Sequence, residues 1–166
     1  MTVTTSGSAK LTLPAEDQIL ITREFDAPKE LVYKAFTTPE LVRRWWHANR
    51  GQMTASEIDL RVGGTYRFAM DARGFEVAFH GEYLEIVPGE KIVSTEVYEG
   101  LPDGVSEKEG RTVNTVTLTE KEGRTTMTML IQAANKTARD AIIESGMEDG
   151  LQDALDLLEQ TAQSLG

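Results

Sequence analysis

The chain of 166 residues contains no cysteine. This absence excludes disulfides, thiolate nucleophiles and thiolate metal ligands, and it is typical of proteins from reducing compartments. No run approaches the roughly 18 apolar residues of a membrane-spanning helix, and the first ten residues lack the basic and apolar stretches of a secretory signal. We therefore predict a cytoplasmic protein without membrane insertion.

Basic residues are also scarce. Lys and Arg number 17 against 27 Asp and Glu, which makes the net charge −10 at pH 7, and the densest basic spot is Arg43-Arg44. The resulting negative field repels phosphate backbones, so we expect no nucleic-acid partner. Two histidines without cysteine do not favour a catalytic zinc site, which takes three suitable protein ligands. We predict neither a metal nor any other cofactor.

Strong catalytic motifs are missing as well. The sequence has no Gly-x-Ser-x-Gly elbow, no phosphate-binding Gly-Lys-Ser/Thr loop and no His-Glu-x-x-His. Any catalysis would therefore depend on isolated side chains that the fold brings together.

Two changes of pattern divide the chain. Residues 1–16 are rich in Thr and Ser without periodicity, which predicts a flexible tail before a single domain over 17–164. Alternation predicts a strand over 18–25, and Pro28 and Pro39 each begin a short helix. From Thr54 onward the apolar period changes from helical to two. It predicts six further strands, over 54–61, 64–71, 75–87, 91–99, 112–120 and 124–132.

Turn residues separate these strands and predict a meander. Gly63-Gly64 is typical of a two-residue hairpin, and Pro88-Gly89 and Glu122-Gly123 mark two further reversals. The polar stretch 100–111 is the longest expected loop. A last segment, 136–162, repeats apolar residues at helical spacing and predicts one long amphipathic helix. The fold class is therefore α+β, a curved and mostly antiparallel sheet of about seven strands wrapped around this helix.

Four phrases resemble a known family. They are Arg23-Glu-Phe-Asp-Ala-Pro-Lys-Glu-Leu-Val-Tyr-Lys-Ala-Phe36, Thr38-Pro-Glu-Leu-Val-Arg-Arg-Trp-Trp46, Asp59-Leu-Arg-Val-Gly-Gly-Thr-Tyr-Arg-Phe-Ala-Met70 and Gly81-Glu-Tyr-Leu-Glu-Ile-Val-Pro88. With the order of elements they resemble the helix-grip fold of the START and birch-pollen-allergen (SRPBCC) superfamily. Within it they resemble the domain named after the activator of the heat-shock-protein-90 ATPase.

This resemblance implies a central cavity between sheet and terminal helix, which in some members holds lipids, polyketides or other apolar molecules. One departure concerns its shape. Members often have Gly-Trp in the terminal helix, where this chain has Gly150-Leu151. If that Trp lines the cavity in other members, the resemblance implies that the cavity of this chain is wider or differently shaped at Leu151.

Residue types support a ligand cavity independently. Aromatic and Met side chains alternate along two predicted strands, and Met adapts to irregular apolar ligands. The glycines Gly146 and Gly150 each cost up to about 1 kcal/mol against Ala inside a helix, so they indicate close packing or free space. The alternative is that all these residues fill an ordinary core. The predicted ligand-binding residues are Trp45, Trp46, Tyr66, Phe68, Met70, His80, Met127, Met129, Met147, Gly150 and Leu151.

Trp45 and Trp46 point about 100° apart on a helix, so one ring, Trp45 by its phase, is expected in the core. Trp46 would then lie at the cavity mouth or at a partner surface. The alternative is that both rings are partly packed under the loop that follows. His80 is the candidate acid or base, with Glu76 and Tyr83 as companions, provided that a bulge near Gly81 turns it inward. Its alternative is a half-exposed strand histidine without chemistry.

Three functions remain open at this point. The first is binding of a hydrophobic small molecule, the second a cyclase- or hydrolase-like enzyme on the same cavity, and the third a chaperone-interacting module. We predict a monomer or a homodimer.

Overall fold

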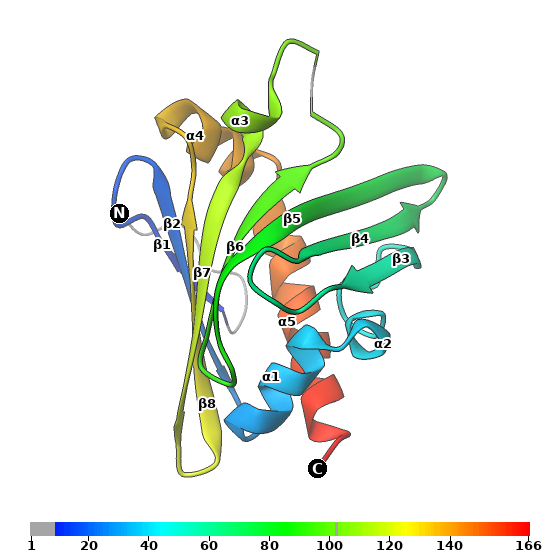
Figure 1. Ribbon diagram of the computed structural model, residues 1–166, viewed down its shortest axis with the longest axis vertical. Coiled ribbons are helices and arrows are strands. Elements are labelled where there is room, and N and C mark those ends of the chain that lie inside the picture. Colours follow the sequence, from blue (N-terminus) through cyan, green and yellow to red (C-terminus); the bar gives the residue numbers. More distant parts are fainter. Residues whose placement is uncertain (1–8, 102) are drawn as a thin grey trace.

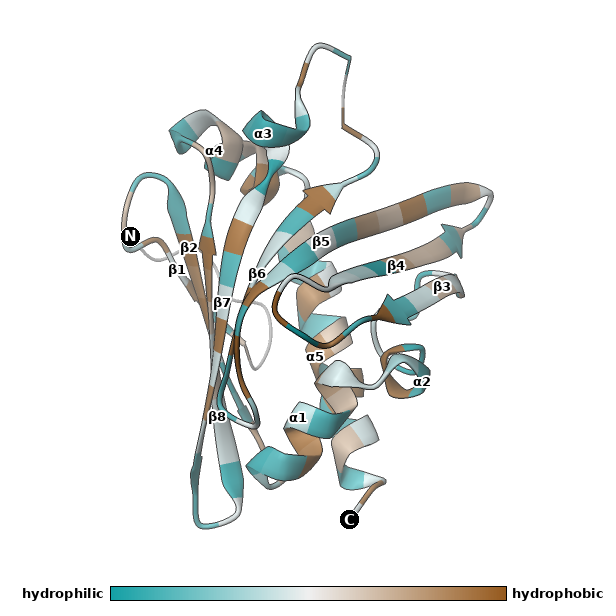
Figure 2. Cartoon of the chain, in the orientation of Figure 1, coloured by the Kyte–Doolittle hydropathy of each residue, from teal (hydrophilic) through white to brown (hydrophobic). Residues whose placement is uncertain are grey.

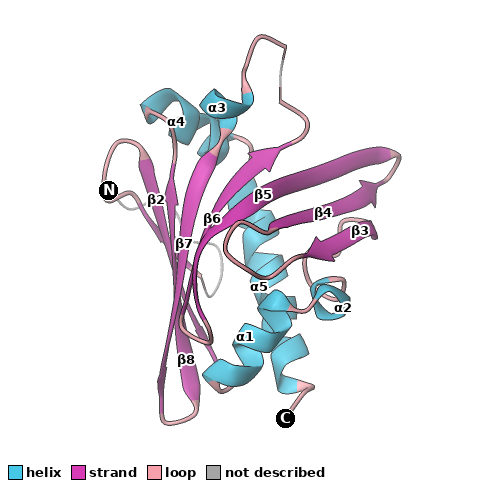
Figure 3. Ribbon diagram, in the orientation of Figure 1, coloured by secondary structure: helices cyan, strands magenta, loops and turns pink. Residues whose placement is uncertain are grey.

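The computed structural model describes residues 9–101 and 103–166, in which one bent antiparallel sheet lies against helices on its concave side (Figures 1 and 3). The helix-grip fold class is confirmed, with eight strands where about seven are predicted. In chain order the elements are β1 (Lys10–Thr12), β2 (Gln18–Phe25), α1 (Lys29–Thr37), α2 (Pro39–Val42), β3 (Gln52–Ile58), β4 (Thr65–Ala72), β5 (Phe75–Val87), β6 (Lys91–Tyr98), α3 (Glu107–Gly110), β7 (Thr112–Lys121), β8 (Arg124–Gln132), α4 (Lys136–Glu144) and α5 (Met147–Gln163).

The sheet runs β1-β2-β8-β7-β6-β5-β4-β3, and every neighbouring pair is antiparallel. The six-strand meander from β3 to β8 is therefore confirmed, and β2 joins it beside β8. Hydrophobic and hydrophilic residues alternate along β7 (Figure 2), as expected for a strand with one face toward the core. No helix within the described residues is long and apolar enough to cross a membrane.

The packed core lies between α5, α1 and the β2–β8 side of the sheet. Its largest fully buried side chains come from these elements and from β1; they include Phe25, Leu11, Ile19, Ile21, Met127, Leu155, Leu158 and Val32. Further along the sheet, toward β4, the same concave face is not filled in this way. The site lies there.

The predicted long terminal helix is wrong in one respect, because it is two helices. α4 ends at Glu144 and α5 begins at Met147. Gly146 between them takes the left-handed conformation, with φ of 81°, which a continuous right-handed helix does not allow. The apolar spacing continues across the break because Ile143 of α4 and Met147 of α5 both pack against the core. Periodicity alone therefore could not reveal the break between α4 and α5.

The predicted tail is also wrong in its second half. Residues 1–8 lie outside the described residues, but β1 pairs with β2, and its Leu11 is fully buried opposite Ile21. The side chain of Gln152 in α5 makes two hydrogen bonds to the backbone of Ala9, the residue before β1. The backbone N–H of Ala9 donates to Gln152 Oε1 (2.9 Å), and Gln152 Nε2 donates to the Ala9 carbonyl (2.8 Å). A three-residue strand is too short to show a period of two.

Two of the three predicted reversals are confirmed. β5 and β6 are joined at Pro88-Gly89, and β7 and β8 at Glu122-Gly123, where both residues have positive φ as in a primed turn. The two-residue hairpin at Gly63-Gly64 is wrong, because β3 ends at Ile58 and β4 begins at Thr65. This longer loop hydrogen-bonds to β5 instead. Gly63 N–H donates to the Tyr83 carbonyl, and Tyr83 N–H to the Gly64 carbonyl, both at 2.9 Å.

A candidate ligand cavity

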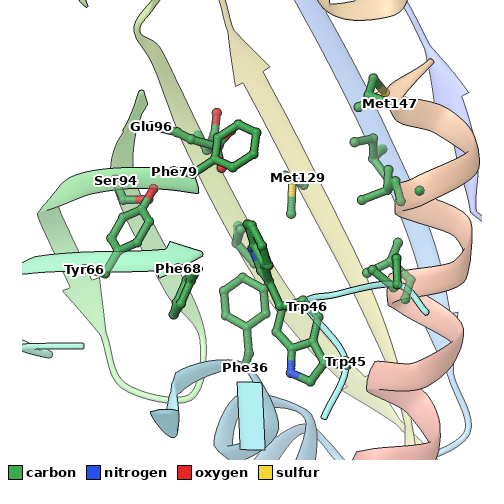
Figure 4. Close-up of a pocket in the computed structure, with 18 of the residues that line it drawn as sticks. Phe36, Trp45, Trp46, Tyr66, Phe68, Phe79, Ser94, Glu96, Met129 and Met147 are labelled. Atoms are coloured by element: carbon green, nitrogen blue, oxygen red, sulfur yellow. The ribbon is translucent and has the colours of Figure 1, made fainter. Parts of the chain in front are cut away.

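A cavity of about 310 Å³ lies between the concave face of the sheet and the first half of α5 (Figure 4). Period-two alternation points every second side chain of five strands into it, and the turn after α2 closes its lower side. The strand residues that line it are Tyr66, Phe68 and Met70 of β4, Val77, Phe79 and Tyr83 of β5, Ile92, Ser94 and Glu96 of β6, and Asn114 and Val116 of β7, with Met129 and Ile131 of β8 and Ile21 of β2.

Aromatic rings follow one another along this wall. Each ring centroid lies within 5.9 Å of the next, which is the usual range for interacting aromatic pairs. In order from β6 the rings are Tyr98, Phe79, Trp46, Phe68, Tyr66 and Tyr83. We call these six residues the aromatic series. Five of its members, all except Tyr98, line the cavity and present a long π surface to anything inside it.

Both tryptophans face inward from the turn after α2. Trp45 is buried, as predicted; its indole N–H donates to the Ala35 carbonyl (3.0 Å), and its ring stacks on Phe36 with an interplanar angle of 13°. Trp46 is half-buried and contacts Phe68 and Phe79. Its ring therefore lies inside the cavity wall and is turned away from any outer partner surface.

The side chain of Tyr66 extends from β4 across Gly81 of β5 to β6. It pairs with Gly81, and its hydroxyl donates to the Thr95 carbonyl on β6 (2.6 Å). A Cβ on Gly81 would lie 2.7 Å from the Tyr66 hydroxyl oxygen, so only glycine leaves room for this ring. Burial raises the pKa of both Tyr66 and Tyr83, and they remain neutral hydroxyl groups.

Glu96 is the only acidic side chain among the described lining residues, and sequence reasoning missed it. Burial raises the pKa of its carboxyl, while a hydrogen bond from Asn114 lowers it. Asn114 is oriented by Thr112, whose hydroxyl donates to Asn114 Oδ1 (2.9 Å). The available signal was its phase, since Glu96 is two and four residues from Ser94 and Ile92 on the same face of β6.

The helix wall is partly open. A Cβ built on Gly150 would meet no atom nearer than Arg50 Nε at 4.0 Å, and one on Gly146 would meet none within 4 Å. Close packing therefore does not explain either glycine. Arg50 is the only basic lining side chain in the described part of the cavity, and it is held outward, by Asp153 (2.8 Å) and by the Ala48 carbonyl (2.7 Å).

Nine of the eleven predicted ligand-binding residues line the cavity. Met127 does not, because it is fully buried in the packed core between β8 and the helices. The nine are Trp45, Trp46, Tyr66, Phe68, Met70, Met129, Met147, Gly150 and Leu151.

The predicted inward position of His80 is wrong. Its Nδ1 lies 3.0 Å from Glu99 and its Nε2 3.2 Å from Glu107, on the outer face of the sheet. Glu76 lies on that face too, 3.4 Å from Arg67. The bulge in β5 lies between Tyr83 and Glu85, too late to turn His80 inward. Of the predicted catalytic trio only Tyr83 lines the cavity.

On the outer face of the sheet, Arg67 and His80 form a charged cluster around Glu99. Arg67 donates to both carboxylate oxygens of Glu99, each at 2.9 Å, and His80 contacts the same carboxylate. The Arg67 guanidinium, with the His80 hydrogen bond, lowers the pKa of Glu99 to about 2. Within the part of the chain that the structure describes, no group of three or more His, Asp or Glu side chains has the arrangement of a metal site.

Comparison with known proteins places this geometry in a family. The family model described as "Activator of Hsp90 ATPase homolog 1-like protein" matches residues 26–163, which spans both walls of the cavity. The chain belongs to this family. The family shares the helix-grip fold of the SRPBCC superfamily, which commonly binds hydrophobic ligands.

Solved structures agree with this fold. A protein from Rhodobacter sphaeroides is 24% identical with a TM-score of 0.84, over 94% of this chain and 99% of that chain. A protein from Chromobacterium violaceum is 29% identical with a TM-score of 0.75, over 89% and 98%. One from Nitrosomonas europaea is 22% identical with a TM-score of 0.79, over 92% and 97%. Among curated proteins no match is found. These likenesses concern the fold.

Proposed function

We propose that the protein binds an apolar or amphipathic small molecule, such as a lipid, a polyketide or an aromatic compound, between the sheet and α5. The observation that carries the proposal is the cavity of about 310 Å³ behind the aromatic series. Small-molecule sites begin at roughly 300 Å³ and are mostly apolar with a few polar groups. Ser94, Asn114 and Glu96 supply those polar groups on one wall.

Partial exposure of large apolar side chains supports binding over simple core filling. Trp46, Phe68, Phe79 and Met129 all face the concave side, yet each retains accessible surface. Covering such surface with an apolar ligand is worth about 25 cal/mol for each Å² removed from water. A ligand would therefore gain free energy from rings that the protein leaves partly uncovered.

The two other functions have less support. An enzyme based on His80 and Glu76 would need both to reach the cavity, but they lie on the outer face. A chaperone contact through Trp45 and Trp46 would need exposed rings, but Trp45 is buried and Trp46 contacts Phe68 and Phe79.

Titration with the neutral dye Nile red tests the proposal. We expect saturable enhancement of dye fluorescence by the folded protein, and competition by fatty acids or aromatic compounds. Leu151→Trp places a larger ring in the cavity wall and should weaken dye binding by at least about tenfold, or 1.4 kcal/mol. Gln160→Trp is the matched control, because Gln160 is exposed on the same helix.

Saturable binding that survives Leu151→Trp unchanged would place the dye elsewhere and contradict the proposal. Absence of binding across dye, fatty acids and aromatic compounds would contradict it as well. Circular dichroism of both variants checks that α5 still forms.

A further inference from the structure

Glu96 stands apart from the other carboxylates of the protein because it faces an apolar cavity. It projects from β6 on the same face as Ser94 and Ile92, and Figure 4 shows its carboxyl at the aromatic wall. Among the described residues, no cationic side chain acts on the pKa of its carboxyl, which responds to burial and to Asn114. The one basic lining residue, Arg50, is engaged by Asp153 and the Ala48 carbonyl. The protein therefore supplies Glu96 with no counter-ion from the described lining.

Neutral partners satisfy only part of this carboxylate. Asn114 donates a hydrogen bond to it, and the Asn114 oxygen is already occupied by Thr112. The nearby Tyr66 hydroxyl donates to the Thr95 carbonyl and is not available. A carboxylate accepts about four hydrogen bonds. Acceptor capacity therefore remains on the side that faces the cavity.

Aromatic faces flank the same position. Tyr98 lies two residues along the same face of β6, and it pairs with Phe79 across the strands, with ring centroids 5.1 Å apart. Trp46 lies edge-on to Phe79 at 5.8 Å. Ring faces attract cations, most strongly where water is excluded. A carboxylate beside such rings is a favourable environment for an organic cation.

We propose that the ligand carries a basic nitrogen on an apolar body, with its ammonium group bound by Glu96 beside Phe79 and its body lying along the aromatic series toward Trp46. This inference rests on the proposed function, and it specifies in addition that the ligand is positively charged. An anionic ligand would meet the Glu96 carboxylate and the net charge of −10. A neutral alcohol would form a hydrogen bond but would leave the half-buried charge of Glu96 unpaired.

Three probes of one shape separate these cases. They are 4-phenylbutylamine, 4-phenylbutanol and 4-phenylbutyrate, which at pH 7 are cationic, neutral and anionic. Calorimetric titration of the full chain should show the amine binding at least about tenfold more tightly than the alcohol, as expected for one charge-assisted contact in a desolvated site. The anion should bind most weakly.

Glu96→Gln should remove the preference for the amine and leave alcohol binding within about twofold, since the apolar contacts remain. Glu82→Gln is the matched control. It removes the same charge from an exposed position of β5, so it should preserve the order of the three probes.

Equal binding of amine and alcohol, or a preference that survives Glu96→Gln, would overturn this inference while the proposed function stands. Failure of all three probes would overturn it too, and Nile red binding then decides separately whether the cavity binds apolar molecules at all.

Discussion

Helix α5 crosses two regions of the molecule that differ in packing. Toward its C-terminus, Leu158 and Ala162 are fully buried against α1 and the β2–β8 side of the sheet. Toward its N-terminus, Gly150 and Leu151 border the cavity. One amphipathic helix thus serves as core in one half and as a cavity wall in the other. The difference lies in what the opposing strands present. They present mostly aliphatic side chains to the C-terminal half of α5 and a row of contacting aromatic rings to its N-terminal half.

The largest expected effect comes from truncating leucines in the two halves. Leu158→Ala should lower the free energy of unfolding by about 2–5 kcal/mol, because it opens a hole in a closed core. Leu151→Ala should cost about 1 kcal/mol or less, since it enlarges a space that is already accessible. Urea unfolding of both variants measures the difference. Equal losses would contradict the division of α5 into packed and open halves.

Glu96→Gln should stabilise the unliganded protein at neutral pH. Burial raises the pKa of Glu96 above the 4.5 of the unfolded chain. The unfolded state therefore releases this proton first, and wild-type stability falls as pH rises from 4.5 toward the raised pKa. The variant has no such loss. Thermal unfolding should show equal stability near pH 4 and a more stable variant at pH 7. The reverse order would contradict the half-buried position of this carboxyl in the cavity wall.

The two glycines of the helical region should respond in opposite directions. Gly150→Ala should stabilise by about 0.5–1 kcal/mol, because the added Cβ meets nothing closer than 4.0 Å within an α-helix. Gly146→Ala should destabilise by about 1–2 kcal/mol, because φ is 81° there. Denaturant unfolding measures both. A stabilising Gly146→Ala would indicate that α4 and α5 form one continuous helix.

Glu99, three residues after Glu96, should behave in the opposite way and more weakly. Its pKa of about 2, lowered by Arg67 and His80, means that it contributes stability above pH 4.5, which is lost as pH falls from 4.5 toward 2. Glu99→Gln should therefore destabilise near pH 7, by less than about 1 kcal/mol because the ion pairs are partly exposed. Near pH 2 the two proteins should converge. A more stable variant at pH 7 would contradict this assignment.

Local pattern predicts much of the fold and less of the site. Alternation with turn residues located the strands, because one face of each is in contact with the core. Strand β1 was not predicted, because three residues are too few to show a period of two. The break at Gly146 was not predicted either, because glycine occurs both within helices and at their ends. These features depend on tertiary contacts and backbone conformation.

The site residues show the same division. Tyr66, Phe68 and Met70 were predicted from alternation alone, and they line the cavity. His80 was selected for its chemistry, against the phase that puts Phe79 inward. Glu96 was overlooked because a charged residue within a strand usually indicates the solvent face. Its neighbour Asn114, which comes from another strand, is visible only in the folded protein.

The most direct test of a ligand-binding cavity is a nitrogen–proton NMR titration of the unliganded protein with 4-phenylbutylamine. The two tryptophans provide indole signals at the wall, and the strands provide backbone amides. We predict saturable shifts of the Trp46 indole and of the amides of β4 and β5 at residues 66–70 and 77–83, with a smaller shift of the Trp45 indole, which stays hydrogen-bonded to Ala35. Shifts confined to the outer face around Glu99, or no saturable shift with either this amine or Nile red, would contradict the account.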